Sequence, residues 1–177
     1  MRILSLCVSM VMVAAVSVNA GPQPVAKSAS ALKIPTLNNR VAYTSVSGVK
    51  LRPIKGGLID MSYYKGKVVL VVYFATWCPP CLKEIPDLIA MQRALAPRGF
   101  QVIGISVDGQ KSALASFVNA QKITYPIVYD NPDLADIFGD VQAIPTAYLI
   151  DRKLRIVDKW TGYHSRREVE SRIAKWL

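Results

Sequence analysis

The feature that most constrains the fold is an unbroken apolar run leading into two cysteines at the start of a helical pattern. Residues 68–74, VVLVVYF, contain no charged residue and are rich in β-branched side chains, which predicts a strand buried on both faces of a sheet. After Cys81 the apolar residues take helical spacing, so we expect a helix with Cys78 at its N-cap. Both cysteines are thereby placed where a buried strand passes into a helix.

Cys78 and Cys81 are predicted to alternate between dithiol and disulfide. The thiolate is the nucleophile in disulfide exchange, and the unpaired N–H groups and partial positive charge of a helix N-terminus favour an anion on Cys78. Pro79 and Pro80 fit the first helical turn, where a missing N–H costs nothing. We assign Cys78 as the nucleophile and Cys81, one turn further on, as the resolving thiol. No cofactor other than this redox-active disulfide is expected.

Two other uses of the cysteine pair are half of a zinc site and a plain structural disulfide. A zinc site needs four nitrogen or sulfur ligands, and the rest of the chain offers only Cys7 and His164. A disulfide that closes so short a loop constrains little chain entropy and stabilises weakly. The pattern therefore favours redox chemistry, and no metal is expected.

From about residue 34 the chain resembles the exported thiol-disulfide oxidoreductases of the TlpA/ResA/CcmG type, within the thioredoxin superfamily. The residues that carry the resemblance are the FATWCPPC run at 74–81, Pro86, the AIPT run at 143–146 and Gly162. The resemblance implies an α/β protein, a thioredoxin-like three-layer α/β/α sandwich with a mixed central sheet and an N-terminal β-hairpin.

The resemblance also implies a substrate groove. Pro145 is expected to be cis and to face the cysteines, with Ile144 contacting the partner chain and Gly162 lining the same groove. Trp77 is expected to shield the disulfide and to offer a face to the substrate. The predicted substrate-binding residues are thus Trp77, Pro79, Pro80, Ile144, Pro145 and Gly162.

Two positions depart from the pattern of cytosolic thioredoxins. Val72 stands where those proteins carry a buried aspartate, and Gly104 stands where they carry its partner lysine. Glu84, three residues after Cys81, lies on the same helix face and matches a functional acid of the ResA-like branch. Glu84 is therefore a candidate to relay protons to Cys81. The alternative is an ordinary acid favoured by the helix dipole, and burial decides between the two.

The N-terminus is typical of a secretory signal. Arg2 precedes an apolar stretch at 3–16, and Val18-Asn19-Ala20 resembles a cleavage site. We expect residues 1–20 to be a signal peptide, 21–33 a flexible leader and 34–177 one thioredoxin-like domain. Export places the dithiol in an oxidising compartment, the periplasm, without an integral membrane segment after cleavage. An uncleaved anchor is the alternative.

The remaining elements follow from periodicity and turn residues. A hairpin of 41–43 with 49–51 is expected around Ser47-Gly48, followed later by a strand at 100–107 parallel to 68–74. The other predictions are helices at 111–120 and 132–138, a strand hairpin of 147–150 with 154–160, and a final helix at 166–176.

The formal net charge of +10 raises the question of nucleic-acid binding, but the basic residues are scattered and no such motif accompanies them. We expect a monomeric, reducing thiol-disulfide oxidoreductase. The resemblance implies that its substrates are disulfide-bearing exported proteins, as in cytochrome c maturation, and that its electron donor is a membrane protein of the DsbD/CcdA kind. One alternative is a copper-delivery module of the Sco-like type completed by His164, although such proteins have CxxxC spacing. The other is a peroxiredoxin-like peroxidase, which requires a threonine where Ala75 stands.

Overall fold

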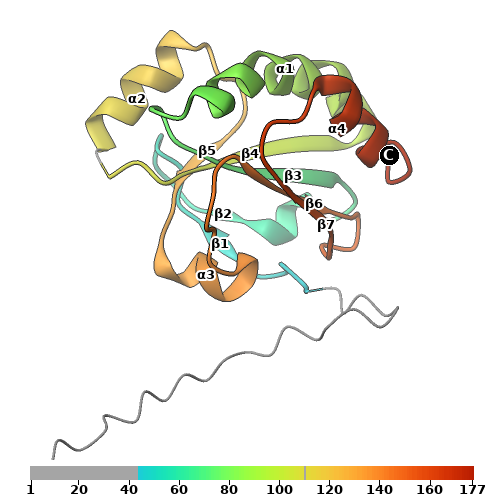
Figure 1. Cartoon of the computed structure of the whole chain (residues 1–177). Coiled ribbons are helices and arrows are strands. Elements are labelled where there is room, and N and C mark those ends of the chain that lie inside the picture. The colour runs from blue at the N-terminus through green and yellow to red at the C-terminus, as the bar shows by residue number, and fades with distance from the viewer. Residues whose placement is uncertain (1–43, 110) are drawn as a thin grey trace, which may run out of the picture. The chain divides into compact units, whose positions relative to one another are not determined.

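The computed structural model describes residues 44–109 and 111–177 (Figure 1). The predicted signal peptide and leader lie outside the described residues. Two short 3-10 turns, η1 (Met61–Tyr64) and η2 (Ala96–Arg98), accompany the strands and helices. In chain order the strands and helices are β1 (Lys50–Leu51), β2 (Ile59–Asp60), β3 (Val68–Phe74), α1 (Pro79–Leu95), β4 (Phe100–Ser106), α2 (Lys111–Ala120), β5 (Ile127–Tyr129), α3 (Pro132–Phe138), β6 (Thr146–Ile150), β7 (Ile156–Thr161) and α4 (Arg166–Ile173).

The central sheet has the strand order β5-β4-β3-β6-β7. Strands β3, β4 and β5 are parallel, whereas β6 runs antiparallel to β3 and β7 antiparallel to β6. The crossover from β3 to β4 contains α1, as a parallel pair requires. Strand β3 lies in the middle and all seven of its residues are buried, so the prediction of a strand covered on both faces is confirmed.

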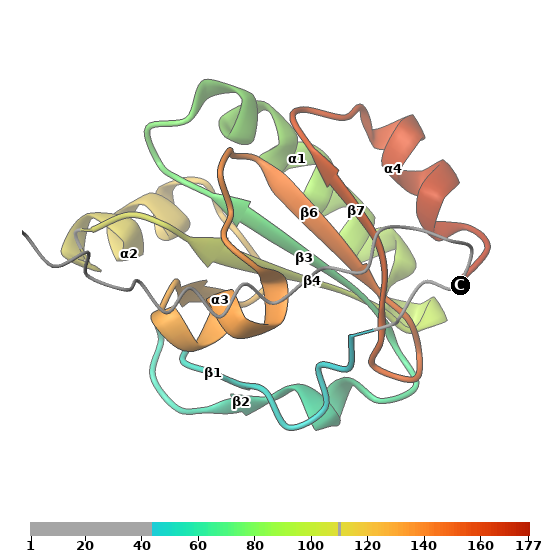
Figure 2. The ribbon, with the colours of Figure 1, turned by 60° about the horizontal axis from the view of Figure 1, so that its bottom comes forward.

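Alternate residues of β3 face two separate apolar cores, as the twofold repeat of a strand dictates. One core joins Leu70 and Val72 to residues of α1, α2 and α4. The other joins Val71 and Tyr73 to α3 and to the segment containing β1 and β2. Figure 2 shows α3 on the opposite side of the sheet from α1 and α4. The three-layer arrangement with a mixed sheet is therefore confirmed.

The strand expected at 49–51 is present as β1, but the partner observed for it is the later segment β2, which was not predicted. Strand β1 pairs antiparallel with β2, and a turn at Gly48, with φ of +81°, precedes it. The strand expected at 41–43 lies outside the described residues. Strand β5 was not predicted, and it has only three residues. Helix α4 ends at Ile173 rather than at Trp176. The carbonyls of Trp176 and Leu177, which follow the helix, accept hydrogen bonds from Arg152.

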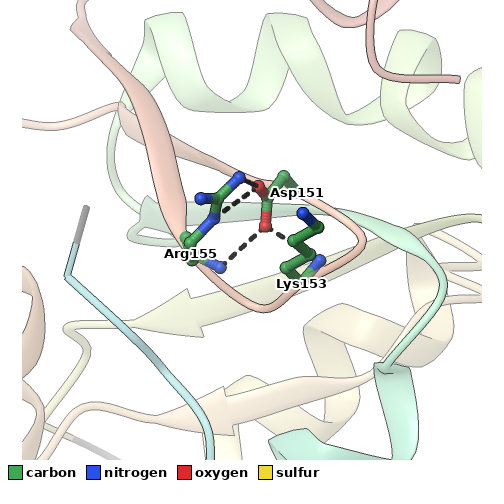
Figure 3. A network of polar contacts seen from close by, with 3 residues as sticks. All are labelled: Asp151, Lys153 and Arg155. Carbon is green, nitrogen blue, oxygen red and sulfur yellow. Dashed lines mark hydrogen bonds and ion pairs between the residues drawn. The ribbon is translucent and has the colours of Figure 1, made fainter. Parts of the chain in front are cut away.

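The hairpin of β6 and β7 is organised by one buried acid (Figure 3). Asp151 accepts hydrogen bonds from the backbone N–H groups of Lys153 and Arg155, both at 2.9 Å. The guanidinium of Arg155 also donates to it, at 2.8 and 2.5 Å. Burial by itself would raise the pKa of Asp151, but these hydrogen bonds outweigh it and hold the pKa below its ordinary value. The carboxylate thus closes the turn that positions β7 beside β6.

Candidate active site

Cys78 and Cys81 form a disulfide where β3 passes into α1, with their Cα atoms 5.3 Å apart. Cys78 is the N-cap of α1 and has extended backbone angles, and Pro79 and Pro80 occupy the first helical positions. The backbone N–H of Cys81 donates to Cys78 Sγ at 3.4 Å. Because this donor and the helix dipole both act on Cys78, the arrangement favours a thiolate on this sulfur in the reduced protein.

The two cysteines are buried, whereas the residues beside them are exposed to solvent. Cys78 is 4% exposed and Cys81 2%, a difference too small to identify the attacking sulfur. Trp77, directly before them, is 68% exposed, and Pro79 and Pro80 are exposed on the first turn of α1. The disulfide is therefore shallowly buried beside an apolar surface that a substrate can contact.

The loop before β6 faces Cys78. The bond between Ile144 and Pro145 is cis, and the carbonyl oxygen of Ile144 lies 3.8 Å from Cys78 Sγ. The N–H of Gly162, with φ of +88°, donates to the carbonyl of Pro145 at 2.8 Å. A positive φ is readily adopted only by glycine. Segments far apart in the sequence, which hold the predicted substrate-binding residues, are thus brought together around the disulfide.

Glu84 is 7% exposed in the second turn of α1. The backbone N–H of His164 donates to its carboxylate at 2.9 Å. Burial raises the pKa of Glu84 to about 7, against the lowering effect of this hydrogen bond, and the charge of Asp87 raises it further. Glu84 and Val72 line the same small hollow. The carboxyl group of Glu84, on α1, therefore lies in the region where β3 carries Val72 in place of the aspartate of cytosolic thioredoxins.

Tyr125, which sequence analysis missed, is one of three side chains packed above Gly104, where Ile127 and Phe74 lie closer to it. In the sheet Gly104 is paired with Val72, and a Cβ at Gly104 would lie 2.5 Å from Ile127 Cδ1 and 3.5 Å from Tyr125 Cε2. Burial, and then the charge of Glu84, raise the pKa of Tyr125 above its ordinary value. Tyr125 thus lies on the same side of the sheet as Glu84. No local pattern marks it, because it precedes β5 in a short loop.

His164 is held by packing and through its backbone. Its ring makes an edge contact with Trp160 at 6.1 Å between centroids, and the Arg172 guanidinium lies 5.0 Å from the same indole. Among residues 44–109 and 111–177, no three His, Cys, Asp or Glu side chains come together in a way that could hold a metal ion. In the same part of the chain, no helix has the length and apolar character needed to cross a bilayer.

The fold and the site together define a thiol-disulfide oxidoreductase of the thioredoxin superfamily, of the TlpA/ResA/CcmG-like kind. The chain belongs to the AhpC/TSA family, whose model matches residues 44–159. ResA of Bacillus cereus, a thiol-disulfide oxidoreductase, is 27% identical over 69% of this chain and 70% of that protein. ResA of Bacillus subtilis (strain 168) is 30% identical, over 63% of each chain.

Solved structures agree with this class. A thioredoxin-family thiol:disulfide interchange protein from Chlorobium tepidum TLS has a TM-score of 0.71 and 30% identity, over 77% of this chain and 98% of that one. StoA from Bacillus subtilis has a TM-score of 0.62 at 23% identity, over 72% and 97%, and supports the fold. The resemblance inferred from the motifs is confirmed.

Proposed function

We propose that the protein reduces disulfides of exported proteins, with Cys78 as the attacking thiolate and Cys81 as the resolving thiol. The observation that carries the proposal is the position of Cys78 Sγ, which accepts the N–H of Cys81 and lies 3.8 Å from the Ile144 carbonyl oxygen. An anion on this sulfur is stabilised at the point where the cis-proline loop faces it.

The reaction proceeds in two exchanges. Cys78 thiolate attacks one sulfur of the substrate disulfide, which forms a mixed disulfide and releases the other substrate sulfur as a thiolate. Cys81 thiolate then attacks the Cys78 sulfur, forms the intramolecular disulfide and releases the second substrate thiolate. The substrate gains two electrons and the protein loses two.

Glu84 is proposed to exchange a proton with Cys81 during the second step. The two residues are three positions apart on α1 and share a helix face. A carboxyl whose pKa is about 7 is present in both protonation states near neutral pH, which suits a proton relay. A solvated glutamate would be almost fully ionised there.

The substrate chain is proposed to lie along Ile144 and Pro145 and to pair with their backbone. Exposed Trp77, together with Pro79 and Pro80, offers an apolar surface beside the disulfide, and the N–H of Gly162 holds the loop through its bond to the Pro145 carbonyl. Because backbone pairing and apolar contact place few demands on side chains, such a groove suits many partner sequences.

We place the reaction in the periplasm, after removal of a signal peptide at residues 1–20, and expect a monomer. A membrane electron donor of the DsbD/CcdA kind would restore the dithiol. Cytochrome c maturation is one process that uses such a reductase. The peroxidase alternative is disfavoured because buried Ala75 offers no hydroxyl where a peroxiredoxin needs threonine, and no observation favours copper delivery through His164.

Trapping of mixed disulfides tests the assignment. In cells, Cys81→Ser should accumulate covalent complexes with exported proteins, since Cys78 can attack but nothing resolves the product. Cys78→Ser and the double variant serve as controls and should trap none. If Cys78→Ser traps the same partners instead, the assigned roles are reversed. A reduction potential near that of strong oxidants, about −120 mV, would refute the reducing direction.

A further inference from the structure

An acid after the end of β4 reaches across to the loop that carries the cysteines. The Asp108 carboxylate accepts the backbone N–H of Thr76 at 3.0 Å and the hydroxyl of Thr76 at 2.7 Å. The hydroxyl of Ser106 donates to the same carboxylate at 2.7 Å. Thr76 and Asp108 are 32 residues apart, so this is a tertiary contact rather than a local turn.

Thr76 lies at the middle of the connection between β3 and α1. On one side, the carbonyl of Phe74 accepts the N–H of Val107, which ties the end of β3 to the chain after β4. On the other side, the N–H of Cys78 donates to the carbonyl of Ala75 at 3.2 Å. Asp108 therefore holds the residue from which the chain turns toward Cys78.

Oxidation state changes how much this contact matters. In the disulfide form, the bond to Cys81 itself holds Cys78 against the first turn of α1. In the dithiol form that bond is absent, and the position of Cys78 depends on the loop that leads to it. Hydrogen bonds to a carboxylate are roughly twice as strong as those between neutral groups. The contact of Asp108 with Thr76 therefore stabilises the position of Cys78 more in the reduced state than in the oxidised state.

We propose that Asp108 is a positioning residue of the dithiol: through Thr76 it keeps Cys78 at the N-cap of α1 after the disulfide opens. The inference rests on the proposed role of Cys78 as the attacking thiolate. Loss of Asp108 disfavours the reduced state selectively, so the disulfide becomes harder to reduce and Cys78 attacks more slowly. A purely structural contact would stabilise both oxidation states equally and leave the potential unchanged.

The test compares Asp108→Ala with Asp136→Ala. The second variant removes an exposed carboxylate from α3, which lies on the face of the sheet opposite α1. Equilibrium with glutathione gives the reduction potential, and reaction of the reduced protein with oxidised glutathione gives the rate. For Asp108→Ala we expect about a tenfold shift of the equilibrium toward the disulfide, which corresponds to a reduction potential about 30 mV more negative than that of the wild type. A several-fold slower attack should accompany it, whereas Asp136→Ala should match the wild type.

Two further variants separate position from charge. Asp108→Asn keeps an oxygen acceptor without the charge and should recover part of the loss, whereas removal of a charge alone would favour the thiolate and make the potential less negative. Thr76→Val should reproduce part of the defect and be non-additive with Asp108→Ala. Urea unfolding of each oxidised variant establishes that it is folded.

Failure of the proposed function and failure of the positioning role give different results. If the wild type does not exchange with glutathione, the proposed function fails. If it does, but Asp108→Ala has the potential and rate of Asp136→Ala, only the positioning role is refuted. A potential of Asp108→Asn that is less negative than that of the wild type would likewise overturn it, because the effect of charge would then outweigh that of position.

Discussion

Replacing Glu84 by glutamine should stabilise the protein above pH 7 and leave its stability nearly unchanged below pH 4.5. Glutamine has the size of glutamate and retains an oxygen that can accept the His164 N–H. What it removes is the charge that the folded protein must bury when Glu84 ionises. The pH dependence of the difference between the two proteins therefore reports on this one carboxyl.

The magnitude follows from the pKa of this carboxyl, which burial raises from 4.5 to about 7. Below pH 4.5 it is neutral in both the folded and the unfolded chain. Between pH 4.5 and 7 the unfolded chain loses its proton first, so the free energy of unfolding falls as pH rises. Above pH 7 the loss is complete and amounts to about 3 kcal/mol at full desolvation, because one pKa unit is about 1.4 kcal/mol. Screening by nearby solvent reduces the expected value to about 2 kcal/mol.

Urea unfolding of the oxidised proteins at pH values from about 4 to 9 measures the difference. Asp87→Asn is the matched control, since it removes a neighbouring carboxylate of α1 and should leave the fall in stability between pH 4.5 and 7 in place. A difference between Glu84→Gln and the wild type that stays flat over this interval would refute the raised pKa, and with it the physical basis for a proton relay.

Three other substitutions test the fold around the site. Gly104→Ala brings Cβ to 2.5 Å from Ile127 Cδ1 and should cost about 1–3 kcal/mol by overpacking, seen as a lower urea midpoint; an unchanged midpoint contradicts this. Asp151→Asn weakens the bonds from Arg155 and should cost about 1–2 kcal/mol at pH 7. The cost should shrink as pH falls from 3.8 through the lowered pKa of the folded Asp151 carboxyl, because protonation then weakens the same bonds in the wild type; a difference that stays constant with pH would contradict this. Arg152→Lys removes a guanidinium that donates to four carbonyls and should lower the free energy of unfolding by about 1 kcal/mol, seen as a lower melting temperature. A melting temperature equal to that of the wild type would contradict a stabilising role for these four hydrogen bonds.

Several elements could be predicted because their signals are local. The apolar run of β3 and the N-cap position of Cys78 depend on residues within one or two turns of each other. Asn131 and Pro132 mark the start of α3 in the same way, and the structure confirms it, with Asn131 accepting the N–H of Asp133. The capping box of Ser165 and Glu168 likewise begins α4 at the expected residue.

Other features could not be predicted because they arise between distant segments. Strand β5 is too short for periodicity to identify and exists through its pairing with β4. Tyr125 was missed because its place over Gly104 depends on how the loop before β5 packs on the sheet. Asp108 carries no local signal, and only the fold brings it to Thr76.

A buried strand that leads into a dithiol at a helix N-terminus is encoded in the order of the residues alone, and the resemblance of the motifs indicated the superfamily. Short-range spacing is sufficient for these features, because strand alternation, helix caps and the place of proline depend on neighbouring residues. The burial of Glu84 and its hydrogen bond from the His164 N–H, the approach of Ile144 to Cys78 and the anchoring of the active-site loop came only from the packed fold. Burial and contacts across tens of residues set pKa values and positions, and they exist only once the layers have packed.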